Sequence, residues 1–190
     1  MQELFSVYAD LACFAKGVAN GYPIAAVTGK KEIMKVMEGL QVTTTYGGEA
    51  LSLAAVVAAL EEYKKKKVHA YLWRIGKKLM DGLNKIARES GVNIRWLGYA
   101  PMSSFKFMYD EETSSKMMTV FLQECARKGV LFRRGGLVLV TFSHTEKDVE
   151  NTLKTVEDVL NVIKKYYDKN RLDELLKNTG KTAESIRKFG

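Results

Sequence analysis

Two long helical patterns, at residues 49–66 and 69–90, separate stretches of different character in this chain of 190 residues. Before them the sequence predicts two short apolar strands around a glycine-rich turn, followed by one short helix. After them, strand and helix patterns alternate as far as residue 168. Because two strands are not stable alone, residues 1–60 are not expected to fold independently. Residues from about 75 to 168 could form a compact α/β unit.

The spacing of apolar residues predicts the individual elements. In the first long helix alanines and leucines lie on nearly all sides, which predicts burial against another layer or subunit. The second long helix has apolar residues at three- and four-residue spacings and is expected to end at Gly91. Thr145, with Asp148 three residues later, is the expected N-cap of the last helix. The other predicted elements are strands at 9–14, 24–28, 92–97, 104–108, 130–132 and 137–142 and helices at 31–38, 113–128 and 145–167.

Composition favours an ordinary globular protein, with 46% apolar and 27% charged residues. The longest apolar run, residues 51–60, is too short to cross a bilayer. No leader pattern opens the chain, so a cytoplasmic location is expected. Cys13 and Cys125 lie far apart in apolar surroundings, and two buried, reduced thiols are predicted.

The net charge of +8 raises the possibility of a nucleic-acid partner. The basic excess lies in residues 61–190, where lysines alternate with acidic residues along helical faces. Only Lys64–Lys67 forms a dense cluster, and no aromatic residues are interleaved with it. A solvated helix end explains this cluster better than a phosphate-backbone contact, so nucleic acid is not the expected partner.

Lys16 is the residue with the clearest chemical content. Five uncharged residues, Leu11 to Ala15, lead into it, and Gly17 follows at once. One interpretation is a lysine that ends a strand and extends into solvent. The other is a lysine whose amine is removed from water, because such an amine tends to lose its proton and becomes a nucleophile for carbonyl groups.

The segment from Thr43 to Ala50 is the second candidate. Its hydroxyl groups and two glycines precede a helix, where backbone N–H groups and the helix dipole could hold an anion. A helix cap followed by a glycine hinge explains the same residues equally well.

Both segments resemble those of one enzyme family. Phe14–Val27 is similar to the lysine motif of class III (subgroup II) pyridoxal-phosphate-dependent aminotransferases, and Thr45–Gly48 is similar to their threonine-aromatic-glycine-glycine segment. Residues 136–148 resemble the C-terminal signature of the glutamate-1-semialdehyde aminomutase branch. The resemblance implies that Lys16 forms an internal aldimine with pyridoxal 5'-phosphate. It also implies that Thr45 binds the cofactor phosphate of the neighbouring subunit in a homodimer.

Two departures from the family pattern concern the same site. The family usually has Asn-Pro where this chain has Glu49 and Ala50, and Glu49 is expected to point away from a phosphate. Many members carry an arginine for a substrate carboxylate in the strand that corresponds to residues 137–142, and this strand has none. Arg133 and Arg134 just before it are substitutes or surface residues, and we favour the surface. His144 is expected to be hydrogen-bonded locally.

The resemblance implies an α/β chain that is the C-terminal part of a fold type I transferase. Residues 1–60 would be a remnant of the cofactor-binding large domain, 61–90 connecting helices, 91–168 the small α/β domain and 169–190 a polar tail. The family's glycine-serine loop, stacking aromatic residue and aspartate, which precede the lysine, are not found. We therefore expect this portion of an aminotransferase or aminomutase, which would act on a small amino or keto substrate, to be inactive alone. The alternative is a non-catalytic basic α/β module that binds protein or nucleic acid.

Overall fold

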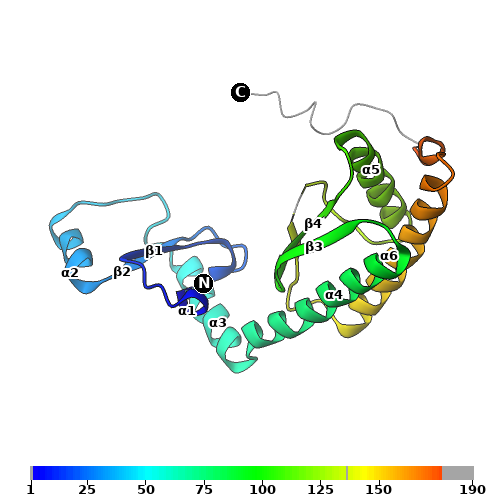
Figure 1. The fold of residues 1–190 in the computed structure, drawn as a ribbon. Coiled ribbons are helices and arrows are strands. Elements are labelled where there is room, and N and C mark those ends of the chain that lie inside the picture. Colours follow the sequence, from blue (N-terminus) through cyan, green and yellow to red (C-terminus); the bar gives the residue numbers. More distant parts are fainter. Residues whose placement is uncertain (1, 136, 177–190) are drawn as a thin grey trace. The chain divides into compact units, whose positions relative to one another are not determined.

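The computed structural model describes residues 2–135 and 137–176. The chain divides into two compact units, the first reaching Val68 and the second beginning at His69. Figure 1 shows the elements of both units in chain order. Each unit is best understood by itself, because the two differ sharply in how much of their apolar surface is buried.

The first unit contains one small sheet and several helices. Strands β1 and β2 are antiparallel, with Leu11 opposite Gly29 and Phe14 opposite Ala26, which confirms the predicted pair of strands. The short helix predicted at 31–38 and the long helix predicted at 49–66 are confirmed as well. The elements are α1 (Gln2–Phe5), β1 (Leu11–Phe14), η1 (Lys16–Val18), β2 (Ala26–Gly29), α2 (Lys31–Met34), η2 (Lys35–Gly39) and α3 (Ala50–Lys65).

Most apolar side chains of this unit are exposed. Its buried residues, among those described, are Ala19, Ser52 and Val68. The predictions of a buried first strand and a buried α3 are therefore wrong for this chain, and so is the prediction of a buried Cys13. The physical reason is that two strands and one helix provide no second layer to cover them.

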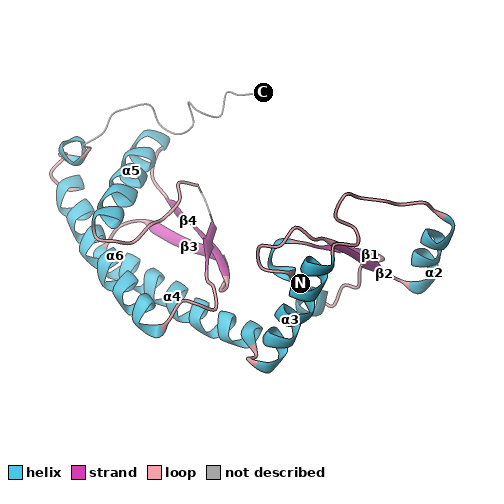
Figure 2. Ribbon diagram, turned by 180° about the vertical axis from the view of Figure 1, so that it is seen from behind, coloured by secondary structure: helices cyan, strands magenta, loops and turns pink. Residues whose placement is uncertain are grey.

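The second unit is a three-stranded antiparallel sheet in the order β3-β4-β5. Its three long helices lie along one side of β3 and β4, as Figure 2 shows. Helix α4, which lies in the predicted connecting segment 61–90, contributes to the core of this unit. The elements are α4 (Val68–Ser90), β3 (Ile94–Tyr99), β4 (Met102–Phe107), α5 (Glu111–Arg127), β5 (Leu137–Leu139), α6 (Glu146–Tyr167) and η3 (Leu172–Leu175).

Aromatic residues form the centre of this core. Trp96 of β3 stacks on Phe105 of β4 with ring centroids 5.4 Å apart, and Phe121 of α5 packs edge-on against both rings. Alternate residues of β3 and β4 are buried, as expected for a sheet with one covered face. The apolar residues predicted to define the inner side of α4 are also buried, with Leu72 only partly so: Leu72, Ile75, Leu79, Leu83 and Ile86.

The predicted ends of the helices are confirmed. Thr145 and Asp148 form a reciprocal capping box at the start of α6. Gly91 and Gly129, with φ of 68° and 86°, follow α4 and α5 in the left-handed conformation that favours glycine. No described helix combines the length and the apolar character needed to cross a membrane.

Two strand predictions in this unit need correction. Residues 130–132 form no strand, because the Val130 N–H bonds back to the carbonyl of Cys125 and so completes the end of α5. The strand predicted at 137–142 stops at Leu139, where its pairing with β4 ends opposite Met102. Of the predicted tail, η3 is described, and residues 177–190 lie outside the described residues.

Candidate active site

Lys16 lies two residues after the end of β1, at the start of the 3₁₀ turn η1. Its φ is 53°, in the left-handed region that side chains with a Cβ rarely adopt. A left-handed residue other than glycine costs on the order of 1–2 kcal/mol. Such conformations persist where the surrounding structure holds them, and they gather at functional sites.

The expectation that Lys16 ends a buried strand, with its amine removed from water, is not met within this chain. Both Phe14 and Lys16 are exposed. The residues that the structure describes form no hydrogen bond or ion pair with the Lys16 side chain. Its amine has no partner among the described residues, and the groups that would desolvate it are not among them either.

The backbone around Lys16 is held by short-range and long-range hydrogen bonds. The N–H groups of Val18 and Ala19 donate to the carbonyls of Ala15 and Lys16, at 3.3 and 3.4 Å. From α3, 46 residues away, the hydroxyl of Tyr63 donates to the carbonyl of Gly17. No local pattern around Lys16 indicates this last contact.

Thr45 lies in an exposed turn that leads into α3. The turn is closed by hydrogen bonds from the N–H of Gly47 to the carbonyl of Thr44 (3.2 Å) and from the N–H of Glu49 to the carbonyl of Tyr46 (3.3 Å). The Thr45 hydroxyl has no partner among the described residues, so it can donate to an anion.

Glu49 is the N-cap of α3. Its expected orientation away from a cofactor phosphate stays a prediction. Its carboxylate accepts from the N–H groups of Leu51 and Ser52, both at 2.7 Å, and from the Ser52 hydroxyl. The Ser52 hydroxyl, followed by the two N–H groups, holds the pKa of this carboxyl below its usual value. The N–H groups of Leu51 and Ser52 are therefore not available to a phosphate beside Thr45.

Lys16 and Thr45 are connected to different parts of α3. Thr45 precedes the N-terminus of the helix, whereas the Lys16 loop contacts Tyr63 near its C-terminus. From Glu49 to Tyr63 the helix rises by about 21 Å, at about 1.5 Å per residue. This length is far greater than that of one pyridoxal phosphate molecule.

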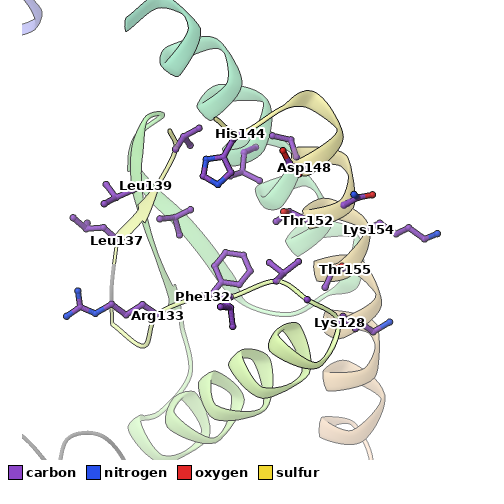
Figure 3. A pocket seen from close by; sticks show the side chains of 18 residues that line it. Lys128, Phe132, Arg133, Leu137, Leu139, His144, Asp148, Thr152, Lys154 and Thr155 are labelled. Atoms are coloured by element: carbon purple, nitrogen blue, oxygen red, sulfur yellow. The ribbon is translucent and has the colours of Figure 1, made fainter. Parts of the chain in front are cut away.

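The second unit contains a cavity of about 840 Å³ between the segment 128–133, β5 and the first half of α6 (Figure 3). Arg133 lies at its edge and is exposed, as predicted. Arg134 is only partly exposed and donates to the hydroxyl of Thr119. His144 is hydrogen-bonded locally, as predicted, since its Nδ1 accepts from the N–H of Thr141 at 2.9 Å.

Comparison with known proteins identifies the family. The sequence model of the class III aminotransferases matches residues 1–160, and the chain belongs to this family. A 3-aminobutyryl-CoA aminotransferase of Cloacimonas acidaminovorans is 28% identical over 166 residues, which cover 86% of this chain and 40% of that protein. A glutamate-1-semialdehyde 2,1-aminomutase of Thermodesulfovibrio yellowstonii is 27% identical over 180 residues, which cover 86% of this chain and 41% of that protein. The chain thus spans about 40% of the length of these curated relatives.

Solved structures agree on the fold. The FumI protein of Sphingopyxis sp. MTA144, solved in its PLP internal aldimine form, has a TM-score of 0.80 and 22% identity over 92% of this chain and 42% of its own. An omega-transaminase from Sphaerobacter thermophilus has a TM-score of 0.73 and 18% identity over 84% of this chain and 40% of its own. The predicted family and the predicted α/β fold, that of part of a fold type I transferase, are confirmed. Pyridoxal phosphate is the cofactor that the sequence predicts and that the FumI structure contains.

Proposed function

We propose that this chain is part of an enzyme that moves amino groups with pyridoxal 5'-phosphate, as an aminotransferase or an aminomutase. Lys16 is the proposed catalytic residue. The observation that carries the proposal is the strained, left-handed Lys16 with an unpaired amine, at the lysine position of the family motif. The substrate would be a small amino or keto compound.

The role of Lys16 follows from the chemistry of a primary amine. When bound, the cofactor supplies a ring that accepts electrons from the substrate carbon next to the amine. An uncharged Nζ of Lys16 would bond to the carbonyl carbon of the cofactor, whose oxygen leaves as water. Once a substrate amine had displaced it, Nζ would take up and return a proton as base and acid. An uncharged Nζ requires the removal of water, which the described residues do not provide.

A partner subunit in a homodimer would cover the exposed Lys16 amine and provide a second contact to the cofactor. We propose that the Thr45 hydroxyl donates to the phosphate group of the cofactor molecule that is bound to the Lys16 of a partner subunit. The rise of about 21 Å along α3 supports this division between two chains. Only the Thr45 hydroxyl and the backbone of its turn could bind the phosphate, because the N–H groups of Leu51 and Ser52 already donate to the Glu49 carboxylate. A cytoplasmic location is part of the same proposal.

The test uses the native protein, isolated from its own cells so that any associated polypeptide is retained. Borohydride reduction followed by peptide mapping should place a pyridoxyl group on Lys16. The variant Lys16→Ala should lose the label and the activity, while Lys35→Ala, an exposed lysine of the same unit, should keep both. A label on another lysine would refute the assignment. Salt-dependent binding to nucleic acid that survives Lys16→Ala, without any label, would favour the non-catalytic module.

A further inference from the structure

The left-handed conformation of Lys16 needs a structural cause. The two hydrogen bonds of the 3₁₀ turn, at 3.3 and 3.4 Å, are longer than the usual N–H···O distance of about 2.7–3.2 Å. They join residues within the same short segment and therefore cannot anchor it to the rest of the unit. Ala19, which follows this turn, is one of the few buried residues of the first unit. An anchor from another element is required.

Helix α3 supplies such an anchor. The Tyr63 hydroxyl donates to the carbonyl of Gly17, the residue directly after Lys16. A Cβ built at Gly17 would lie 3.7 Å from the same hydroxyl, an ordinary van der Waals contact that shows how closely the two segments approach. Because α3 is a 16-residue helix with a capped N-terminus, its side chains are a firm support for a loop that has little other cover.

We propose that Tyr63 is a positioning residue for Lys16. Its hydroxyl holds the Gly17 carbonyl and thereby maintains the backbone conformation that presents the Lys16 amine. This inference rests on the proposed function of Lys16. It adds a residue whose role is to hold the loop while the Lys16 amine reacts. The Thr45 turn leads into the other end of the same helix.

The first test needs no cofactor. In the native protein, with any associated polypeptide retained, hydrogen exchange of the Val18 and Ala19 amides is measured by NMR. Tyr63→Phe keeps the ring but removes the hydroxyl, and it should speed this exchange about fivefold, the factor expected for one hydrogen bond. The matched control is Tyr71→Phe, which removes a hydroxyl bond of the same kind, to the carbonyl of His144 at 2.6 Å in the second unit. It should leave the Lys16 loop unchanged. Unchanged exchange in Tyr63→Phe, or faster exchange along the whole of α3, would overturn the proposal.

The second test uses pyridoxyl labelling of the native protein, with the other lysines as an internal reference. The share of label on Lys16 should fall about fivefold in Tyr63→Phe and stay constant in Tyr71→Phe. A wild-type protein without label on Lys16 would refute the proposed function, while the exchange measurement would still decide the role of Tyr63. A wild-type protein labelled at Lys16, with an equally labelled Tyr63→Phe, would refute the positioning role and leave the proposed function standing.

Discussion

Asn84 takes the place of a neighbouring strand at the edge of the sheet in the second unit. Its amide nitrogen donates to the carbonyl of Trp96 and its amide oxygen accepts from the N–H of Trp96, both at 3.0 Å. Strand β3 pairs only with β4 among the described strands, so Trp96 has no strand partner on its other side. One helix side chain therefore satisfies both backbone groups of the residue at the centre of the aromatic core.

Replacing Asn84 with alanine should lower the free energy of unfolding by about 1–3 kcal/mol, because two partly buried backbone groups lose their partners. Asn151→Ala is the control, since Asn151 is an exposed helical residue of the same unit and gains the same helix propensity. The free energy of unfolding of both variants is measured by urea unfolding of the 190-residue chain, monitored by tryptophan fluorescence and circular dichroism. Equal stability of the two variants would contradict this role for Asn84.

The candidate residues could be identified from the sequence, but how far each of them is buried could not. Lys16 and Thr45 belong to recognisable motifs, but their exposure depends on layers that the local sequence does not describe. Cys13 and Cys125 illustrate the difference, because the sequence predicts burial of both and only Cys125 is buried. Burial raises the pKa of the Cys125 thiol to about 12. Asn84 and Tyr63 act on residues 12 and 46 positions away, so no spacing rule indicates them.

At the level of elements, α4 and the hairpin between β3 and β4 approach each other through a glycine. A Cβ at Gly76 would lie 2.2 Å from the carbonyl oxygen of Ala100 and 2.6 Å from its carbon. These are backbone atoms of a tight turn and cannot move aside individually. At Gly82, on the same helix, a Cβ would instead meet the flexible end of Leu153, 2.7 Å away.

Gly76→Ala should therefore destabilise the second unit by about 1–3 kcal/mol, the usual cost of overpacking, in spite of the better helix propensity of alanine. Gly82→Ala should change stability much less, because the Leu153 side chain can change its rotamer. Thermal unfolding of the two variants in parallel gives the comparison. A Gly76→Ala protein that is as stable as Gly82→Ala would show that the hairpin can shift away from α4.

Helices α4 and α6 are also joined by an exposed ionic network. Glu146 accepts from Lys78 at 2.6 Å and from Arg74, and Lys78 also donates to Glu150 at 3.1 Å. The hydrogen bond from Lys78, followed by that from Arg74, holds the pKa of Glu146 below its ordinary value of 4.5. The bonds from Glu146 and Glu150 raise the pKa of Lys78 above 10.5.

The sign of the pH dependence follows for Glu146. Since its pKa is lowered by folding, the stabilisation is present above about pH 4.5 and is lost as the pH falls through the folded-state value. Glu146→Gln should therefore be less stable than wild type at pH 7 and should approach it in acid. The control, Glu157→Gln, changes an exposed residue of the same helix. Added salt should reduce the difference at pH 7, because the pairs are exposed. A difference that persists at pH 2 would assign the effect to something other than charge.

The elements that the sequence predicted well are those specified by neighbours in the chain. Helix α6 has its cap within four residues, and α5 ends at a glycine, so local chemistry sets their bounds. Residues 130–132 have the composition of a strand, yet their backbone completes a helix end. Strand pairing depends on residues far along the chain, which an apolar run alone does not specify.

Over the whole molecule, the two units differ in how many of their apolar side chains are buried. The second unit has a core of aromatic and aliphatic residues from all its major elements, whereas the first exposes Leu51, Val57 and Leu60 on α3 and Leu11 and Phe14 on β1. Large exposed apolar areas mark surfaces that bind another layer or chain. The second unit should consequently be stable by itself, and the first should depend on a partner.

Limited proteolysis of the 190-residue chain tests this difference. Trypsin should first cut at Lys64–Lys67, the exposed basic segment that comprises the end of α3 and the two residues before α4. It should leave a resistant product that begins near Val68. The product should survive because lysines within α4 to α6 are cut only when a well-packed unit opens. A variant with all four lysines changed to glutamine should be cut within the first unit instead, at Lys30, Lys31 or Lys35, and should yield the same resistant second unit. A resistant product that retains residues 1–60, or equally fast cutting within α4, would contradict the independence of the second unit.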